Sequence, residues 1–346
     1  MIDWVDFFVP LAHDPGQGSP FYAGEVLSTT PDGELDWGIY KRMEMEGSHS
    51  TKVQIRSTVH DHRPGIRVSG NLVKWHQGHN VFGSNDIRAI ILASVSRICD
   101  IARIKPSIAE ISAWASGYEV ELFRVDVTES QDLGSRQRVQ AALRALDASA
   151  HLKMRGRGTY YGDSLLFGKG SRRWSLTAYA KGPEIDKHPL PVGLLEFPLK
   201  AHAEGLLRLE VRMLSMHLKK LGLASLERWS ENTALAVHQM HLSTLEISDS
   251  TMIDTTALDV LPARLKAVYQ LWKEGHDLRE LYPRPTFYRH RAAMLAHGID
   301  IAVKQVRREE SSNVIPLKVV LVAKPATVPD WAMGTPLYFN PTLRVA

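Results

Sequence analysis

The sequence has a single cysteine, Cys99, among its 346 residues. One cysteine excludes an intramolecular disulfide and any zinc site built from several thiolates. Long apolar runs are also missing, because an uninterrupted stretch such as residues 89–93 falls far short of the roughly 20 residues that cross a bilayer. The first residues, MIDWVDFF, include an acid and no basic segment, unlike a secretory signal peptide. These absences predict a cytoplasmic protein with no membrane partner.

Positive charge is concentrated in one stretch of the chain. The net charge of +4 permits nucleic-acid binding without requiring it. Residues 153–173, KMRGRGTYYGDSLLFGKGSRR, carry six cations and one acid. The glycines and tyrosines between them favour a strand–turn–strand that presents Lys169, Arg172 and Arg173 to DNA phosphates. A solvated, glycine-rich surface loop is the alternative.

Apolar periodicity predicts an α+β fold. Helical spacing appears at residues 85–103 and 135–148, and strand alternation at 119–128 and 206–213, with a hairpin and strand over 159–179. This order predicts an antiparallel sheet with helices packed on one face. The periodicity breaks between about residues 230 and 254. The break predicts a first domain over residues 1–235 and a mainly helical domain over residues 236–346.

The C-terminal domain contains a pattern typical of helix-turn-helix units. Two predicted helices, residues 263–273 and 286–296, are joined by a short connection. Arg289 and Arg291 lie near the start of the second helix, where a recognition helix meets DNA bases. A helical bundle that only packs on the first domain is the alternative.

Tyr179 and Lys181 are two residues apart in a predicted strand, so their side chains should share a face. A free tyrosine has a pKa of about 10, and a neighbouring ammonium favours the phenolate. The pair could therefore supply a nucleophile with a charge to stabilise a phosphate. By itself, a Tyr-x-Lys on a strand is usually structural.

Asp126 and Glu210 each interrupt an apolar strand. A carboxylate on such a strand is costly unless it is paired or binds a metal. Two such acids, with a tyrosine strand between them in the chain, resemble an oxygen-ligand site for Mg²⁺ or Mn²⁺. Pairing of each acid with an arginine on the same strand is the alternative.

A family resemblance joins these features. The string QGHNVFG at residues 77–83 resembles a signature of the gene II family of filamentous phage replication initiators. Further landmarks follow in that family's order: RVD at 124–126, TAYAK at 177–181, RLEVR at 208–212, NVIPL at 313–317 and PDW at 329–331. The middle of the chain is also similar to rolling-circle initiators of Gram-positive plasmids, in which a glutamate, here Glu184, follows the Tyr-x-Lys.

The resemblance implies a metal-dependent enzyme that nicks and rejoins a double-stranded origin, with Tyr179 as the nucleophile and Asp126 and Glu210 as metal ligands. Its fold would be that of a HUH-type Rep endonuclease, with a permuted order as an alternative. Those initiators carry two histidines around a bulky apolar residue, whereas Asp61 separates the comparable pair here. His79 is therefore the candidate for a third ligand.

The implied partners are the double-stranded origin and the displaced single strand. Docking of a host helicase and a second nucleophile at Tyr160 or Tyr161 are left open. Two other functions also fit the residues. One is a DNA-binding protein without activity, and the other is a metal-dependent nuclease that uses water.

Overall fold

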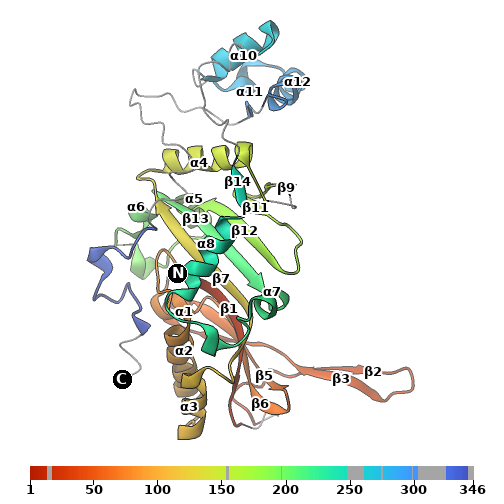
Figure 1. Cartoon of the computed structure of the whole chain (residues 1–346), viewed down its shortest axis with the longest axis vertical. Helices are drawn as coiled ribbons and strands as arrows, with labels where there is room; N and C mark the ends of the chain where they lie inside the picture. The colour runs from red at the N-terminus through yellow and green to blue at the C-terminus, as the bar shows by residue number, and fades with distance from the viewer. Residues whose placement is uncertain are drawn as a thin grey trace. The chain divides into compact units, whose positions relative to one another are not determined.

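Figure 1 shows the computed structural model of the chain, which describes residues 1–13, 18–152, 156–195, 197–247, 261–273, 276–297, 299–302 and 325–341. The chain forms two compact units: Met1–Glu246 together with Leu321–Ala346, and Ile247–Val320. The expected first domain lies within the first unit, whereas the expected C-terminal domain is divided between the two. Lys153 and Arg155 of the basic stretch, and the landmark at residues 313–317, lie outside the described residues.

The described strands and helices have the following bounds. The strands are β1 (Ile2–Pro10), β2 (Glu25–Thr29), β3 (Leu35–Tyr40), β4 (Met43–Glu46), β5 (Lys52–His60), β6 (Arg63–Gly70), β7 (Glu121–Asp132), β8 (Ala150–Leu152), β9 (Gly156–Arg157), β10 (Thr159–Tyr161), β11 (Ser164–Phe167), β12 (Trp174–Ala180), β13 (Leu206–Leu214) and β14 (Leu245–Ile247). The helices are α1 (Leu72–Gln77), α2 (Ile87–Ala102), α3 (Ile108–Ser116), α4 (Arg136–Ser149), α5 (Lys181–Lys187), α6 (Leu199–Ala203), α7 (Ser215–Leu221), α8 (Thr233–Leu242), α10 (Ala263–Lys273), α11 (Leu278–Leu281) and α12 (Arg284–Leu295). The 3₁₀ turns are η1 (Ser48–Ser50), η2 (Val192–Leu194), η3 (Leu226–Arg228) and η4 (Asp330–Ala332).

A nine-stranded antiparallel sheet organises the first unit, in the order β10-β11-β12-β13-β7-β1-β6-β5-β4. Alternation along its strands separates an apolar face, with Leu209 and Val211 on β13, from a polar face. Helices α4, α7 and α8 contact β12, β13 and β7 (Figure 1). The predicted α+β arrangement is confirmed. The sequence interpretation expected only short strands before residue 58, but β1 spans nine residues in the middle of the sheet.

A second apolar cluster builds one end of the polar face. It joins α5, α6 and the loop after α1 to the C-terminal segment, residues 325–341, through the buried residues Val81, Phe82, Ile185, Leu194, Leu199, Ala203, Leu206, Ala332 and Leu337. Leu206 belongs to β13, so this cluster is anchored on the sheet itself. It surrounds the candidate site with fixed backbone rather than with open loops.

The second unit is a small helical body. Its core is formed by side chains from α10, α11 and α12 and the segments beside them: Leu261, Leu265, Val268, Tyr269, Leu278, Phe287, Met294 and Ile301. The one-turn helix α11 connects the two longer helices, as the helix-turn-helix pattern requires. Within the described ranges of the whole chain, no helix combines the length and apolar character needed to span a bilayer.

Candidate nicking site on the polar face of the sheet

Strand register brings the predicted nucleophile and the predicted acids to one face. Tyr179 on β12 lies opposite Arg208 on β13, which in turn lies opposite Ser130 on β7. Glu210 is two residues further along β13, and Asp126 lies in the row after that on β7. Residues directly opposite each other, and residues two apart on a strand, share a face of the sheet. Tyr179, Glu210 and Asp126 therefore lie together on the polar face.

Tyr179 is partly exposed, and its hydroxyl accepts a long hydrogen bond from Arg208 Nη1 at 3.5 Å. Burial raises the pKa of Tyr179 far above its ordinary value, and the Arg208 guanidinium opposes that rise. The carboxylates of Asp3 and Glu210 add to the rise. The phenol is therefore protonated at neutral pH, and a cation placed among these acids would favour its ionisation.

Arg208 is a buried charge at the base of the site. Its side chain is fully buried, with Nε donating to Ser130 Oγ at 3.3 Å and Nη2 lying 2.8 Å from Met1 Sδ. A buried guanidinium without a bidentate carboxylate partner is costly. Arg208 faces the phenol instead of pairing with Glu210. Local pattern could not indicate this role, because arginines flank Glu210 on both sides.

The two predicted metal ligands have different environments. Asp126 is buried, receives both Arg124 nitrogens, one of them at 2.8 Å, and lies 3.3 Å from Arg212 Nε. Glu210 has an exposed fraction of 12% and one long contact, 3.4 Å from Arg212 Nη2. The ion-pair alternative is thus realised for Asp126 and only weakly for Glu210. Burial, together with Asp126 and Asp3, raises the pKa of Glu210 to about 8. A buried acid in this state fits a hard divalent cation.

Asp3 is a third acid that the sequence interpretation did not use. Its Oδ1 accepts hydrogen bonds from Asn71 Nδ2 at 2.8 Å and Asn80 Nδ2 at 3.0 Å. The Asn80 side-chain oxygen accepts from Lys181 Nζ at 2.8 Å, and Glu184 Oε2 lies 2.5 Å from the same Nζ. One asparagine therefore links the N-terminal strand to the lysine after the tyrosine strand.

Lys181 does not lie on a strand beside Tyr179, contrary to the sequence interpretation. Strand β12 ends one residue before Lys181, which begins helix α5. Its side chain is buried, and burial with the Arg208 charge lowers the pKa of Lys181 to about 8. The lysine still lies within the electrostatic reach of Arg208 and Asp3. Its place is fixed by Asn80 and Glu184 rather than by strand alternation.

His79 does not fit the role of a third metal ligand. Its Nδ1 accepts the Val81 N–H at 3.2 Å, and its Nε2 donates to the Leu337 carbonyl at 2.9 Å. Burial lowers the pKa of His79 to about 4, so the ring is neutral with both nitrogens engaged. Gln77 is held similarly and accepts the Phe339 N–H at 2.8 Å. The QGHN string therefore forms a turn that positions Asn80 and binds the C-terminal segment.

A second group of possible ligands lies elsewhere on the sheet. In the described part of the chain, His60, Asp61 and Glu121 are the three residues of ligand type whose ligand atoms lie within 4.8 Å of one another. Asp61 and His62 have φ values of 48° and 63° and form the two-residue turn between β5 and β6. His62 does not belong to the group. Four strand steps separate β5 from β13, so this group is remote from Tyr179.

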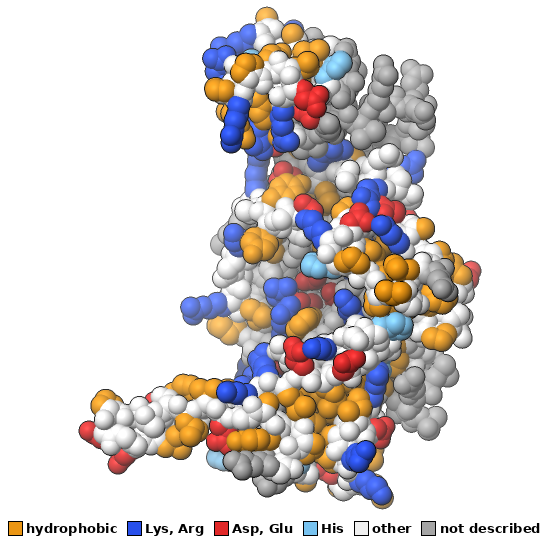
Figure 2. All heavy atoms as spheres, turned by 180° about the vertical axis from the view of Figure 1, so that it is seen from behind, with side chains coloured by type: hydrophobic (Ala, Val, Ile, Leu, Met, Phe, Trp, Pro, Cys, Tyr) orange, Lys and Arg blue, Asp and Glu red, His pale blue; other side chains and the backbone are white. Residues whose placement is uncertain are grey.

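Arginines surround the acids of the polar face. Figure 2 views the side opposite to Figure 1 and shows Lys and Arg side chains around Asp and Glu side chains near its middle. Register places basic side chains on β5, β6, β7 and β13, namely Arg56, Arg67, Arg124 and Arg212. Arg67 forms a bidentate pair with Asp6, at 2.6 and 2.9 Å. The sequence interpretation missed this basic surface, because it forms only when separate strands align.

Comparison with known proteins identifies the family. The family of N-terminal regions of the phage gene II replication-associated protein matches residues 1–232, and the family of its C-terminal regions matches residues 252–337. The chain belongs to the gene II family of phage replication-associated proteins. The resemblance noted in the sequence is confirmed. The gene II replication-associated protein of Enterobacteria phage I2-2 is 34% identical over 337 residues, which cover 95% of this chain and 96% of the relative.

A solved structure of a rolling circle replication initiator protein from Geobacillus stearothermophilus is also similar to this gene II family chain. The likeness covers 74% of this chain and 88% of the other, with 12% identity and a TM-score of 0.33.

The predicted DNA-binding residues of the gene II family chain differ in how accessible they are. Lys169, Arg172 and Arg173 are exposed in the turn between β11 and β12. Arg289 is exposed on α12. Arg291, in contrast, forms a bidentate pair with Asp300, with both contacts at 2.7 Å. Its guanidinium is therefore engaged within the second unit, which argues against a direct DNA contact.

Proposed function

We propose that this gene II family member nicks one strand of a double-stranded phage origin in the host cytoplasm, by attack of Tyr179, to start rolling-circle replication. The main support is the placement of the phenol on the same sheet face as Arg208 and the buried Glu210. Family membership supports a role in DNA replication. The metal-independent part of the chemistry follows from these side chains.

The reaction is a transesterification. The Tyr179 oxygen forms a bond to phosphorus while the bond from phosphorus to the 3′ oxygen breaks. The phenol proton passes to solvent, and the 3′ oxygen gains a proton to become a hydroxyl. The products are a 5′-phosphotyrosine and a 3′-hydroxyl that can prime synthesis. Because one phosphodiester replaces another, a later attack by a 3′-hydroxyl can rejoin the strand without ATP.

The surrounding side chains have separate tasks. The Arg208 guanidinium stabilises the phenolate from below, at 3.5 Å from the oxygen. Lys181, held by Asn80 and Glu184, offsets charge on the phosphate. Asp126, Glu210 and Asp3 would hold a divalent cation, Mg²⁺ or Mn²⁺, which would polarise the phosphate. Asp126 would have to release one of its guanidinium contacts to do so.

The test is incubation of supercoiled phage replicative-form DNA with the full chain and Mg²⁺ or Mn²⁺. The proposal expects open circles, no reaction in chelator, and protein that stays on the 5′ end of the cut strand in denaturing electrophoresis. Nicking without attached protein would indicate a nuclease that uses water. Binding without nicking under any cation would indicate a DNA-binding protein without activity.

The exposed loop between β11 and β12 should hold DNA through its phosphates. Replacing Lys169, Arg172 and Arg173 together by alanine should weaken origin binding and lower the slope of log affinity against log salt by about 3, because each phosphate contact contributes about 0.9. Fluorescence anisotropy over a salt series measures this slope. The matched control is the Lys105→Ala and Lys220→Ala double variant, which changes exposed lysines outside the loop. Equal slopes for the triple variant and wild type would contradict the assignment.

Two arginines on α12 should respond differently to alanine substitution. Arg289→Ala should weaken origin binding by about tenfold without changing stability, because Arg289 is exposed on the predicted recognition helix. Arg291→Ala should lower the free energy of unfolding by about 1 kcal/mol, because it breaks the half-exposed pair with Asp300. Anisotropy and thermal unfolding separate the two effects. An unchanged affinity in Arg289→Ala would rule out this helix surface as a DNA contact.

A further inference from the structure

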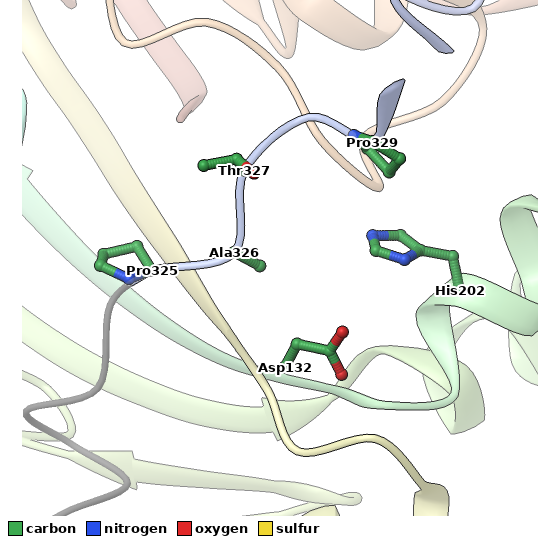
Figure 3. A pocket seen from close by; sticks show the side chains of 6 residues that line it. All are labelled: Asp132, His202, Pro325, Ala326, Thr327 and Pro329. Carbon is green, nitrogen blue, oxygen red and sulfur yellow. The ribbon is translucent and has the colours of Figure 1, made fainter. Parts of the chain in front are cut away.

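An open pocket of about 320 Å³ lies at the end of β7. It is lined by Asp132 of β7, by His202 of α6 and by residues 325–329 of the C-terminal segment. Figure 3 shows the Asp132 carboxylate and the His202 ring directed into the space between them, below the chain that runs from Pro325 to Pro329. None of these residues has a task in the nicking chemistry described above.

The pocket is close to the nucleophile. Asp132 lies opposite Leu206 on β13, two residues before Arg208, the cross-strand neighbour of Tyr179. Two residues along a strand correspond to roughly 7 Å. The Ala326 N–H donates to the Ser130 carbonyl at 2.7 Å, so the roof of the pocket is bonded to the same row of the sheet. DNA whose phosphate lies at Tyr179 would pass the pocket within one or two nucleotides.

Local packing fixes the two polar groups. A Cβ at Gly205 would lie 2.6 Å from Asp132 Oδ1, so the absence of a side chain there makes room for this carboxylate. Asp132 Oδ1 accepts the Gly134 N–H at 2.8 Å. The His202 ring lies edge-on to Trp331, with centroids 6.1 Å apart. Its Nε2 is buried and has no hydrogen-bond partner among the described residues. Burial also lowers the pKa of His202, so the ring is neutral at pH 7.

The chemistry of the lining selects a base over a phosphate. A carboxylate repels phosphate but accepts hydrogen bonds from amino groups on base edges. The Pro325 and Pro329 rings offer apolar walls against which a planar base can pack. A pocket of this volume can take a nucleobase. A neutral imidazole supplies one further hydrogen bond to the edge of the same base.

We propose that this pocket binds one nucleobase of single-stranded DNA beside the scissile phosphate, and that Asp132 and His202 select a base carrying an amino group over thymine. This inference rests on the proposed nicking function for its place in the reaction. Thymine presents carbonyl oxygens on both sides of its single N–H, and these oxygens would face the carboxylate. Guanine, cytosine and adenine each present amino hydrogens instead.

Binding of short oligonucleotides to the full chain tests the selection without requiring cleavage. The probes are a thymidine oligonucleotide and versions with one central guanine, cytosine or adenine, measured by fluorescence anisotropy. Wild type should bind at least one amino-bearing probe about tenfold more tightly than the thymidine probe. Asp132→Asn should reduce that ratio to about one, because an amide replaces one acceptor with a donor. His202→Ala should also reduce it.

Asp36→Asn is the matched control, because it makes the same chemical change at an exposed residue on β3. It should keep the wild-type ratio. Equal binding of all probes by wild type, or a ratio unchanged in Asp132→Asn, would overturn the inference. A variant that lost affinity for all probes equally would also overturn it, because that pattern is a general charge or folding effect. Nicking of replicative-form DNA is measured in parallel, so failure of the nicking function is seen separately from failure of base selection.

Discussion

Replacing Tyr179 by phenylalanine should lower the rate of nicking by about 10⁴-fold or more, because the variant lacks the attacking oxygen. Binding of origin DNA should change little, since Tyr179 gives up only its long hydrogen bond with Arg208 at 3.5 Å. The ring itself remains, so the packing around it is preserved. Conversion of supercoiled to open-circle DNA measures the rate, and anisotropy measures the binding.

Tyr160→Phe and Tyr161→Phe are the controls for this variant. Both residues are exposed on β10, with exposed fractions of 45% and 72%, and they lie at the edge of the sheet. Each should nick at the wild-type rate in a single round. Normal nicking by Tyr179→Phe, or loss of nicking in either control alone, would move the nucleophile away from Tyr179.

Glu210→Gln should lower cation-dependent nicking by about 10²-fold or more, because it removes the buried carboxylate that lacks a close partner. The amide is nearly the same size, so the fold should be kept. Glu121→Gln is the matched control and changes an acid of the remote group with His60 and Asp61. Loss of nicking in Glu121→Gln with full activity in Glu210→Gln would place the cation at the other end of the sheet.

Glu210 should also link stability to pH. Its pKa is raised to about 8 in the folded chain, whereas an unfolded glutamate has a pKa of about 4.3. Protonation is therefore favoured by folding, and this contribution to stability is lost as pH rises from about 5 to about 8. Thermal unfolding of wild type should show that loss, and Mn²⁺ should reverse it near pH 8. Glu210→Gln should show neither effect.

Apolar periodicity made much of this fold predictable from the sequence. The helices at residues 85–103 and 135–148 were expected within two residues of α2 and α4. The polar start of each corresponds to a capping residue, Asp86 and Ser135. The central strand β1 was not predicted, because a strand buried along most of its length has few polar positions to reveal its period.

The candidate site was only partly predictable. Periodicity identified Asp126 and Glu210 as acids in apolar strands, and the resemblance identified Tyr179. Neither Asp3 nor Arg208 could be assigned, because their roles depend on strand order in the sheet and not on local pattern. His79 was misjudged because a histidine in a glycine-rich loop resembles a ligand until both ring nitrogens are seen to bind backbone groups.

Peptide mapping of the covalent adduct is the most direct test of the nicking account. Wild type is reacted with origin DNA and a divalent cation, digested with nuclease and protease, and examined by tandem mass spectrometry. The account predicts a nucleotide mass on the peptide that contains Tyr179, and on no other tyrosine after a single round. An adduct on another residue, or cut DNA with a 5′-phosphate and no adduct, would contradict it.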